Sequence, residues 1–314
     1  MRPSEKETER GMHPQKKAYI YAGITISFWS TVATAFKIAL RYLDILHLLL
    51  ISSVTSLLIL LTILAARGKL SVIKKCTLSE YGRSALLGAL NPFLYYIVLF
   101  KAYSLLPAQV AQPLNMIWPI VLVFLSVPFL KHKVSLKSYI ALFISFTGVY
   151  FISSRGEPLG FKLVEPLGIA LALGSSFIWS FFWIFNVRDK RDEEVKLFLN
   201  FLFATFYIAF AIIFAGGFRK PTTEGLFSGI YVGTFEMGLS FVFWLKALSL
   251  SRSADLIGSL VYLSPFVSLI FIHFIVGEII YGTTIIGLIL IVTGILVQKL
   301  RAPGRGGCRP NLKG

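Results

Sequence analysis

The sequence predicts an all-α integral membrane protein with ten transmembrane helices, arranged as two inverted repeats of five helices each. Composition is the first observation. The 314-residue chain has a mean hydropathy of +0.75 and only 15% charged residues, whereas soluble proteins carry roughly 25%. The second observation is ten apolar runs, each long enough to cross a bilayer, and the third is that motifs of the first half recur in the second.

The first half contains five continuously apolar runs of about 17 to 25 residues, the length that spans the hydrocarbon core of a bilayer. Their apolar character does not alternate with a period of two, which indicates helices and excludes a membrane barrel. The first run is too long for the core of a signal peptide, so we expect it to remain as a membrane span. The predicted helices are 18–37, 46–66, 82–103, 106–130 and 137–154.

The second half repeats this pattern with five further apolar runs. The predicted helices are 166–187, 196–218, 225–247, 254–276 and 280–299. The predicted units of the chain are a cytoplasmic tail (1–17), a first repeat (18–154), an external linker (155–165), a second repeat (166–299) and a cytoplasmic tail (300–314). No water-soluble domain remains between these units.

The net charge of +16 is distributed unevenly along the chain. With the N-terminus in the cytoplasm, 24 of the 31 Lys and Arg residues fall on cytoplasmic segments and 7 on outer segments. This bias follows the positive-inside rule, so we expect a multi-pass protein of the cell (inner or plasma) membrane with both termini in the cytoplasm. The expected neighbour of the basic surface is anionic lipid at the cytoplasmic face, not nucleic acid.

Three short motifs recur in the same order at an offset of 145 or 146 residues. The pairs are Lys101-Ala102-Tyr103-Ser104 with Lys246-Ala247-Leu248-Ser249, Pro119 with Pro265, and Thr147-Gly148 with Thr293-Gly294. Because each half has an odd number of helices, the second copy must enter the membrane from the opposite side. Inverted repeats of this kind place a substrate site near the bilayer midplane, at the interface between the repeats.

These features resemble the drug/metabolite transporter superfamily, EamA type, with two EamA-like units. The best-matching stretches are Phe100-Lys101-Ala102-Tyr103-Ser104 and Val276-Gly277-Glu278, the latter followed by Thr293-Gly294. Asn115-Met116-Ile117-Trp118-Pro119 resembles the aromatic-amino-acid exporter branch. The first unit departs from the pattern, with Lys131-His132 where the second has Gly277-Glu278. The resemblance implies secondary transport of small metabolites, often export, and leaves the substrate open.

Glu236 is the only acidic residue that we place at the midplane, and its repeat equivalent is Asn91. Polar groups at this depth are costly, so each needs a partner or a function. We expect both to face one central cavity, together with Tyr95 and Ser240, each one helical turn from one of them. Glu236 is expected to bind a substrate amino group or to carry a coupled proton; the alternative is a structural carboxyl satisfied by a hydroxyl.

Prolines and tryptophans complete the predicted site. Mid-helix prolines break backbone hydrogen bonds, which indicates cavity walls or hinges at Pro92, Pro119 and Pro265. Tryptophans inside helices, away from the interface belt, suit apolar or planar solutes and can hold an ammonium by cation-π contact. The remaining predicted substrate-binding residues are Trp29, Asn115, Trp118 and Trp179.

The expected function is secondary transport, with export favoured, of a small-molecule substrate such as an amino acid or aromatic compound, by alternating access. We expect no enzyme activity, no cofactor and no metal site, and Cys76 and Cys308 lack metal spacing. A proton or another ion is a candidate for coupling. The alternatives are a phosphorylated-sugar or nucleotide-sugar exchanger, which would need paired basic residues in the cavity, and a membrane-embedded enzyme or sensor. The oligomeric state is left open.

Overall fold

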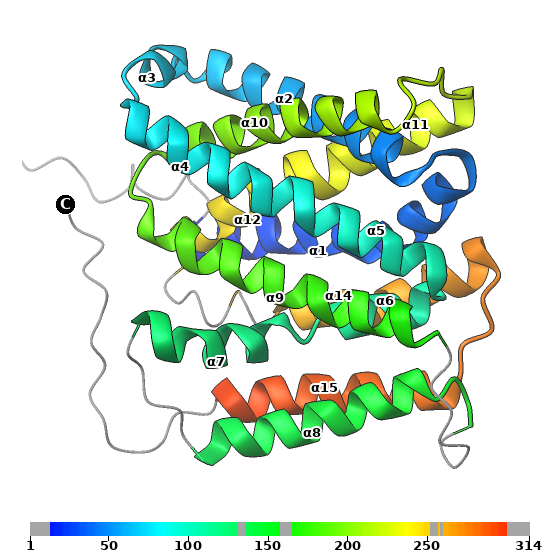
Figure 1. The fold of residues 1–314 in the computed structure, drawn as a ribbon. Coiled ribbons are helices and arrows are strands. Elements are labelled where there is room, and N and C mark those ends of the chain that lie inside the picture. Colours follow the sequence, from blue (N-terminus) through cyan, green and yellow to red (C-terminus); the bar gives the residue numbers. More distant parts are fainter. Residues whose placement is uncertain (1–12, 131–135, 158–164, 252–256, 258–259, 300–314) are drawn as a thin grey trace, which may run out of the picture.

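The computed structural model describes residues 13–130, 136–157, 165–251, 257 and 260–299, and all regular structure within these ranges is helical (Figure 1). The all-α prediction is therefore confirmed for the described part of the chain. Several predicted features lie outside it: most of both tails, residues 158–164 of the linker, Lys131-His132, Cys308 and the start of the run at 254.

Helices of the first half are bounded by caps that the sequence supplies locally. The Asp44 carboxylate accepts hydrogen bonds from the backbone N–H groups of Leu46 and His47, and Thr77 and Glu80 form a capping box. The elements are α1 (Pro14–Tyr42), α2 (Ile45–Ala66), α3 (Leu70–Lys74), α4 (Leu78–Gly88), the π-helical η2 (Ala89–Leu94), α5 (Tyr95–Leu105), α6 (Ala108–Asn115), α7 (Trp118–Leu130) and α8 (Leu136–Ser153).

The second half follows the same order of long and interrupted helices. Asp192 caps α10 and Thr222 caps α11 through their side-chain oxygens. The elements are α9 (Pro166–Arg188), α10 (Glu193–Phe214), α11 (Thr223–Val232), the π-helical η3 (Gly233–Gly238), α12 (Leu239–Leu250), η4 (Val261–Leu263), α14 (Ser264–Phe271), η5 (Ile272–Val276) and α15 (Gly282–Lys299).

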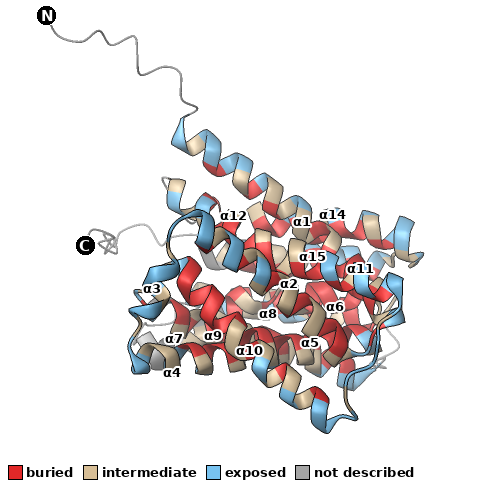
Figure 2. Cartoon of the chain, turned by 90° about the horizontal axis from the view of Figure 1, so that it is seen from above, coloured by how far each residue is buried: buried red, intermediate tan, exposed pale blue. Residues whose placement is uncertain are grey.

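Six helical stretches of the described chain are long and apolar enough to cross a membrane, and shorter apolar helices accompany them. Their outward faces carry large apolar side chains; Phe143 and Phe214, for example, are 76% and 75% exposed. Buried residues concentrate inside the bundle (Figure 2). The count of ten spans stays a prediction, because the fourth run divides into α6 and α7 and the ninth begins outside the described residues.

Helices α8 and α15 lie side by side and cross at glycines (Figure 1). A Cβ atom on Gly148 would lie 2.5 Å from the carbonyl oxygen of Gly287, and a Cβ atom on Gly287 would lie 2.5 Å from that of Gly148. At the 146-residue offset this pair maps onto Gly294 and Ala141, and a Cβ atom on Gly294 would meet the Ala141 carbonyl oxygen at 2.7 Å. Equivalent positions of the two halves therefore make equivalent close contacts at this crossing, as expected for two related halves.

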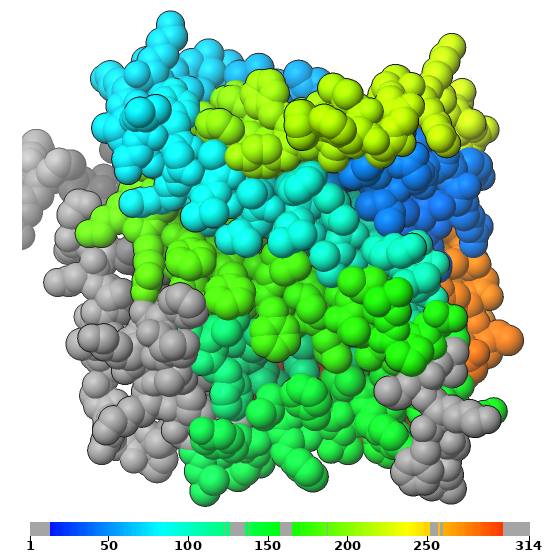
Figure 3. Space-filling view, viewed as in Figure 1, coloured from blue at the N-terminus to red at the C-terminus, as the bar shows by residue number. Residues whose placement is uncertain are grey.

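Other helix contacts follow the same pseudo-symmetry, because contacts made by helices of one half have equivalent contacts made by the corresponding helices of the other half. α1 packs on α12 as α9 packs on α5, and α2 contacts α11 and η3 as α10 contacts α4 and η2. Figure 3 shows part of this arrangement as successive bands of α10, α4 with α5, and α9 over one face. Helix α1 begins and helix α15 ends at the same end of the bundle, which we call the terminal end. We call the other end of the bundle the opposite end.

Candidate functional site

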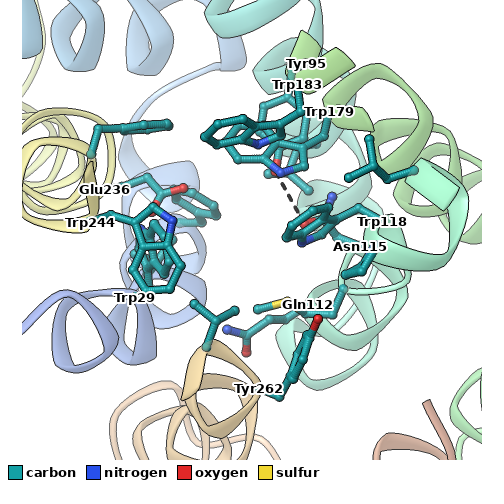
Figure 4. A pocket seen from close by; sticks show the side chains of 18 of the residues that line it. Trp29, Tyr95, Gln112, Asn115, Trp118, Trp179, Trp183, Glu236, Trp244 and Tyr262 are labelled. Atoms are coloured by element: carbon teal, nitrogen blue, oxygen red, sulfur yellow. Dashed lines mark hydrogen bonds between the residues drawn. The ribbon is translucent and has the colours of Figure 1, made fainter. Parts of the chain in front are cut away.

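A cavity of about 340 Å³ lies at the centre of the bundle, between the two halves (Figure 4). This volume suits a small molecule. Its walls come from both halves: α1, α5, α6 and α7 on one side of the repeat boundary, and α9, η3, α12 and η4 on the other. Most of the lining side chains are apolar or aromatic.

All five tryptophans of the chain line this cavity. Trp29 and Trp244 form a pair with ring centroids 5.3 Å apart, and Figure 4 shows them on one side together with Glu236. Trp118, Trp179 and Trp183 lie on the other side. The sequence had indicated Trp29, Trp118 and Trp179. Trp183 is one helical turn from Trp179, so its spacing on the helix could have identified it.

Glu236 lines the cavity from the π-helical segment η3, between α11 and α12. The hydroxyl of Tyr96 on α5 donates a hydrogen bond to Glu236 Oε1 at 3.0 Å, and Tyr96 itself is fully buried. Among the lining residues that the structure describes, Glu236 is the only acid, and none is Lys, Arg or His. Sequence reasoning missed Tyr96, because a contact between residues 140 positions apart leaves no local pattern.

Asn115 anchors the break between α6 and α7. Its Nδ2 donates to Ser175 Oγ on α9 at 2.8 Å, and the Tyr95 hydroxyl donates to its Oδ1 at 3.3 Å. Ser180 Oγ, also on α9, donates to the Trp118 carbonyl at 3.0 Å. Helices α5 and α9 therefore hold the break in place, and Asn115, Tyr95 and Trp118 all face the cavity.

Two polar atoms at the cavity are buried without a hydrogen-bond partner in the described structure: Gln112 Oε1, an acceptor, and Trp183 Nε1, a donor. Buried polar groups are almost always paired. Both residues belong to the cavity lining, so a bound solute could pair with them. Gln112 was not among the predicted site residues.

Asn91 and Ser240 are not among the described lining residues of the cavity, and their roles in a shared site stay predictions. Asn91 is 1% exposed, and its backbone angles (φ −148°, ψ 123°) leave the helical range at a kink. A one-turn spacing therefore no longer places Asn91 and Tyr95 on one face. Ser240 follows η3, whose wider turn shifts the register, and its hydroxyl donates to the Phe235 carbonyl.

The three predicted prolines have different positions. Pro119 lines the cavity as the second residue of α7, where a missing N–H is tolerated. Pro92 lies in η2 at the kink that the sequence predicted, and Pro265 lies at the start of α14; both are buried outside the lining. Their hinge roles stay predictions.

At the opposite end, a latch of hydrogen bonds joins the two halves. The Glu278 carboxylate accepts hydrogen bonds from the backbone N–H groups of Ala108 at 2.7 Å and Gln109 at 3.1 Å, at the start of α6. The Gln109 side chain donates to the Ile279 carbonyl at 2.7 Å and accepts from the Tyr281 N–H and the Thr284 hydroxyl. The latch comprises Glu278, Gln109 and these partners.

At the terminal end, ion pairs join the α2–α4 connection to the α9–α10 connection and to the first turn of α10. Lys69 Nζ lies 2.6 Å from Asp192 Oδ2, and Arg67 pairs with Glu194. Arg191 pairs with Asp189 and also donates to Ser84 at 2.9 Å. Burial opposes ionisation of Asp189, but the hydrogen bonds and charge of Arg191 outweigh it and lower the pKa of this carboxyl.

Comparisons with known proteins identify the family. A model of the EamA-like transporter family matches residues 16–154 and again 166–298. Two proteins of Archaeoglobus fulgidus, both named uncharacterized transporter, are similar: one is 26% identical over 54% of this chain and 60% of its own length, the other 24% identical over 90% of this chain and 98% of its own.

One protein of known crystal structure shares the fold, with a TM-score of 0.65 and 20% sequence identity, over 90% of this chain and 96% of that chain. The family model covers most of the sequence in two successive matches, and the cavity lies between the helices of the two matched regions. The chain is therefore a membrane transporter that belongs to the EamA-like transporter family.

Proposed function

We propose that the protein is a secondary transporter, with export as its favoured direction, that carries small amino-acid-like or aromatic metabolites by alternating access. The observation that carries this proposal is the cavity between two pseudo-symmetric halves, which is lined by all five tryptophans and by Glu236. Two similar halves that share one central site can exchange between two openings by rocking against each other.

The ends of the bundle supply contacts that such a cycle must make and break. The latch ties α6 of the first half to the segment between η5 and α15 of the second half. Opening the opposite end requires these hydrogen bonds to separate. The sequence contains no ATP-binding motif, so the driving energy is expected from the substrate gradient or a coupled ion, with Glu236 as the candidate proton carrier.

A phosphorylated-sugar or nucleotide-sugar exchanger finds no support in the cavity. Such substrates carry negative charge, and the described lining contains no basic side chain to receive it. The remaining alternative is a membrane-embedded enzyme or sensor. An enzyme would need several ionisable groups at one depth, whereas Glu236 is the only acid among the described lining residues.

Uptake into proteoliposomes tests the proposal. A thermal-shift screen against amino acids, nucleobases and amines first identifies a ligand, because binding to the native state raises stability. The ligand is then used in uptake assays with Val32→Phe, which adds a bulky ring to the cavity wall, and with the matched control Val267→Phe on an outward face of α14. We expect Val32→Phe to abolish uptake and Val267→Phe to preserve it. Equal uptake by both variants would contradict the proposal.

A further inference from the structure

We propose that the cavity selects an organic monocation: an aromatic amine that carries no carboxylate, in preference to a zwitterionic amino acid or an anion. The inference rests on the transporter function proposed above and names the substrate class of the same site. It follows from the charge balance of the lining, from the free face of Glu236 and from the placement of the tryptophans.

The charge balance of the lining favours a single positive charge. Glu236 is its one acid, and no Lys, Arg or His is among the described lining residues. The basic residue closest in sequence to a lining residue of α1 is Lys37, next to Phe36. Its Nζ donates to the carbonyls of Tyr103 at 2.9 Å and Leu106 at 3.0 Å, so its ammonium is bound at the end of α5, and Lys37 is not among the described lining residues. A substrate carboxylate would therefore be desolvated without a counter-charge, which is strongly unfavourable.

Glu236 has room for a ligand. Tyr96 donates to Oε1, and the described structure contains no other hydrogen bond to this carboxylate. An ionised carboxylate can accept about four hydrogen bonds through its two oxygens. A substrate ammonium would fill the remaining positions and compensate the charge.

The aromatic side chains around Glu236 complement such a cation. Figure 4 shows Trp29 and Trp244 beside Glu236, where their rings can contact an ammonium by cation-π interaction. Trp118 and Trp179 face them across the cavity and can pack on a planar ring. An aromatic body with a positively charged end therefore fits both walls at once.

Gln112 adds a further feature to the expected substrate. Its unpaired Oε1 accepts hydrogen bonds, and Trp183 Nε1 donates one. A ring hydroxyl could donate to Gln112 Oε1 or accept from Trp183 Nε1, and a ring N–H could donate to Gln112 Oε1, whereas a purely apolar body would leave both atoms unpaired. We therefore expect hydroxylated or nitrogen-containing aromatic amines to bind more tightly than their unsubstituted counterparts.

Tryptophan fluorescence provides a direct binding assay, because every tryptophan of the chain lines this one cavity. The probes share a phenyl ring and differ in charge: phenethylamine is a cation, phenylalanine a zwitterion, 3-phenylpropionate an anion and 2-phenylethanol neutral. Excitation at the red edge of tryptophan absorption leaves the probes silent. We expect phenethylamine to bind the purified native protein at least about tenfold more tightly than the other three probes.

Three variants assign the preference to the carboxylate. Glu236→Gln is expected to remove the discrimination between phenethylamine and 2-phenylethanol. The matched control Glu224→Gln, at the exposed start of α11, is expected to keep it. Tyr96→Phe retains the carboxylate and is expected to keep the preference too, which separates loss of charge from loss of the local hydrogen bond.

Equal or tighter binding of phenylalanine would overturn the proposed substrate class, as would a preference that survives Glu236→Gln or a series in which no probe binds. None of these results affects the transporter proposal as long as uptake is blocked by Val32→Phe and preserved by Val267→Phe. Conversely, a cation preference in binding without any uptake would support the substrate class and refute the transporter.

Discussion

Removal of the Glu278 carboxylate should open the opposite end of the cavity. In Glu278→Ala, the backbone N–H groups of Ala108 and Gln109 lose acceptors at 2.7 and 3.1 Å. Hydrogen bonds to a charged group contribute about 1.5–3 kcal/mol each, but Glu278 is only half-buried and water can replace part of each bond. We therefore expect a net shift of about 2 kcal/mol toward the open form, or about 30-fold in population.

Sided cysteine labelling measures this shift. A single cysteine is placed at Met116, which lines the cavity, in a background that lacks Cys76 and Cys308. A membrane-impermeant thiol reagent is then added to the membrane face at the opposite end. Glu278→Ala should raise the labelling rate about 30-fold, and Glu278→Gln should raise it less, because an amide oxygen still accepts hydrogen bonds.

A matched control is Glu157→Ala, an exposed acid at the same end that is not part of the latch. It should label at the native rate. Labelling of Glu278→Ala at the native rate, or an equal increase in Glu157→Ala, would refute the role of the latch.

Three further predictions concern stability and topology. Gly287→Ala should lower the free energy of unfolding by about 1–3 kcal/mol, because its Cβ atom would meet a backbone carbonyl. The control Gly174→Ala should leave the free energy of unfolding unchanged, because the space around Gly174 is open. Chemical denaturation in detergent measures both variants. Although burial opposes ionisation of Asp189, Arg191 lowers its pKa, so its stabilising contribution is present at neutral pH and lost as the pH falls below about 4. Thermal scans should show a smaller acid sensitivity in Asp189→Asn. Labels in α3 and in the C-terminal tail should both be cytoplasmic, and an external label would contradict the predicted orientation.

The helical spans and the two-half organisation of the fold were predictable, because hydropathy and repeated motifs are visible in the sequence. Continuous apolar runs indicated the helical spans, and the repeated motifs indicated two related halves, which the family matches at 16–154 and 166–298 agree with. Proline chemistry also indicated the breaks near Pro119 and Pro92, since a residue without an N–H interrupts helical hydrogen bonding. These signals are local or periodic, so they can be recognised in the sequence without knowledge of the tertiary structure.

The site was predictable only in part, because helix faces depend on regular geometry. Glu236, Trp118 and Asn115 line the cavity as expected. The role of Asn91 stays a prediction. The chain leaves helical geometry at that residue, so the spacing rule does not apply across the kink. Tyr96 was missed because its hydrogen bond to Glu236 joins two helices that only the packing brings together.

Glu236 and the tryptophans are proposed to form the substrate site of the transporter. Proteoliposome uptake of the best thermal-shift ligand, at several pH values, tests this assignment most directly when native protein is compared with Glu236→Gln and Glu224→Gln. We expect Glu236→Gln to fold, its uptake below saturation to fall by at least about tenfold, and Glu224→Gln to match native protein. Unchanged uptake by Glu236→Gln at every pH would show that Glu236 is not part of the substrate site.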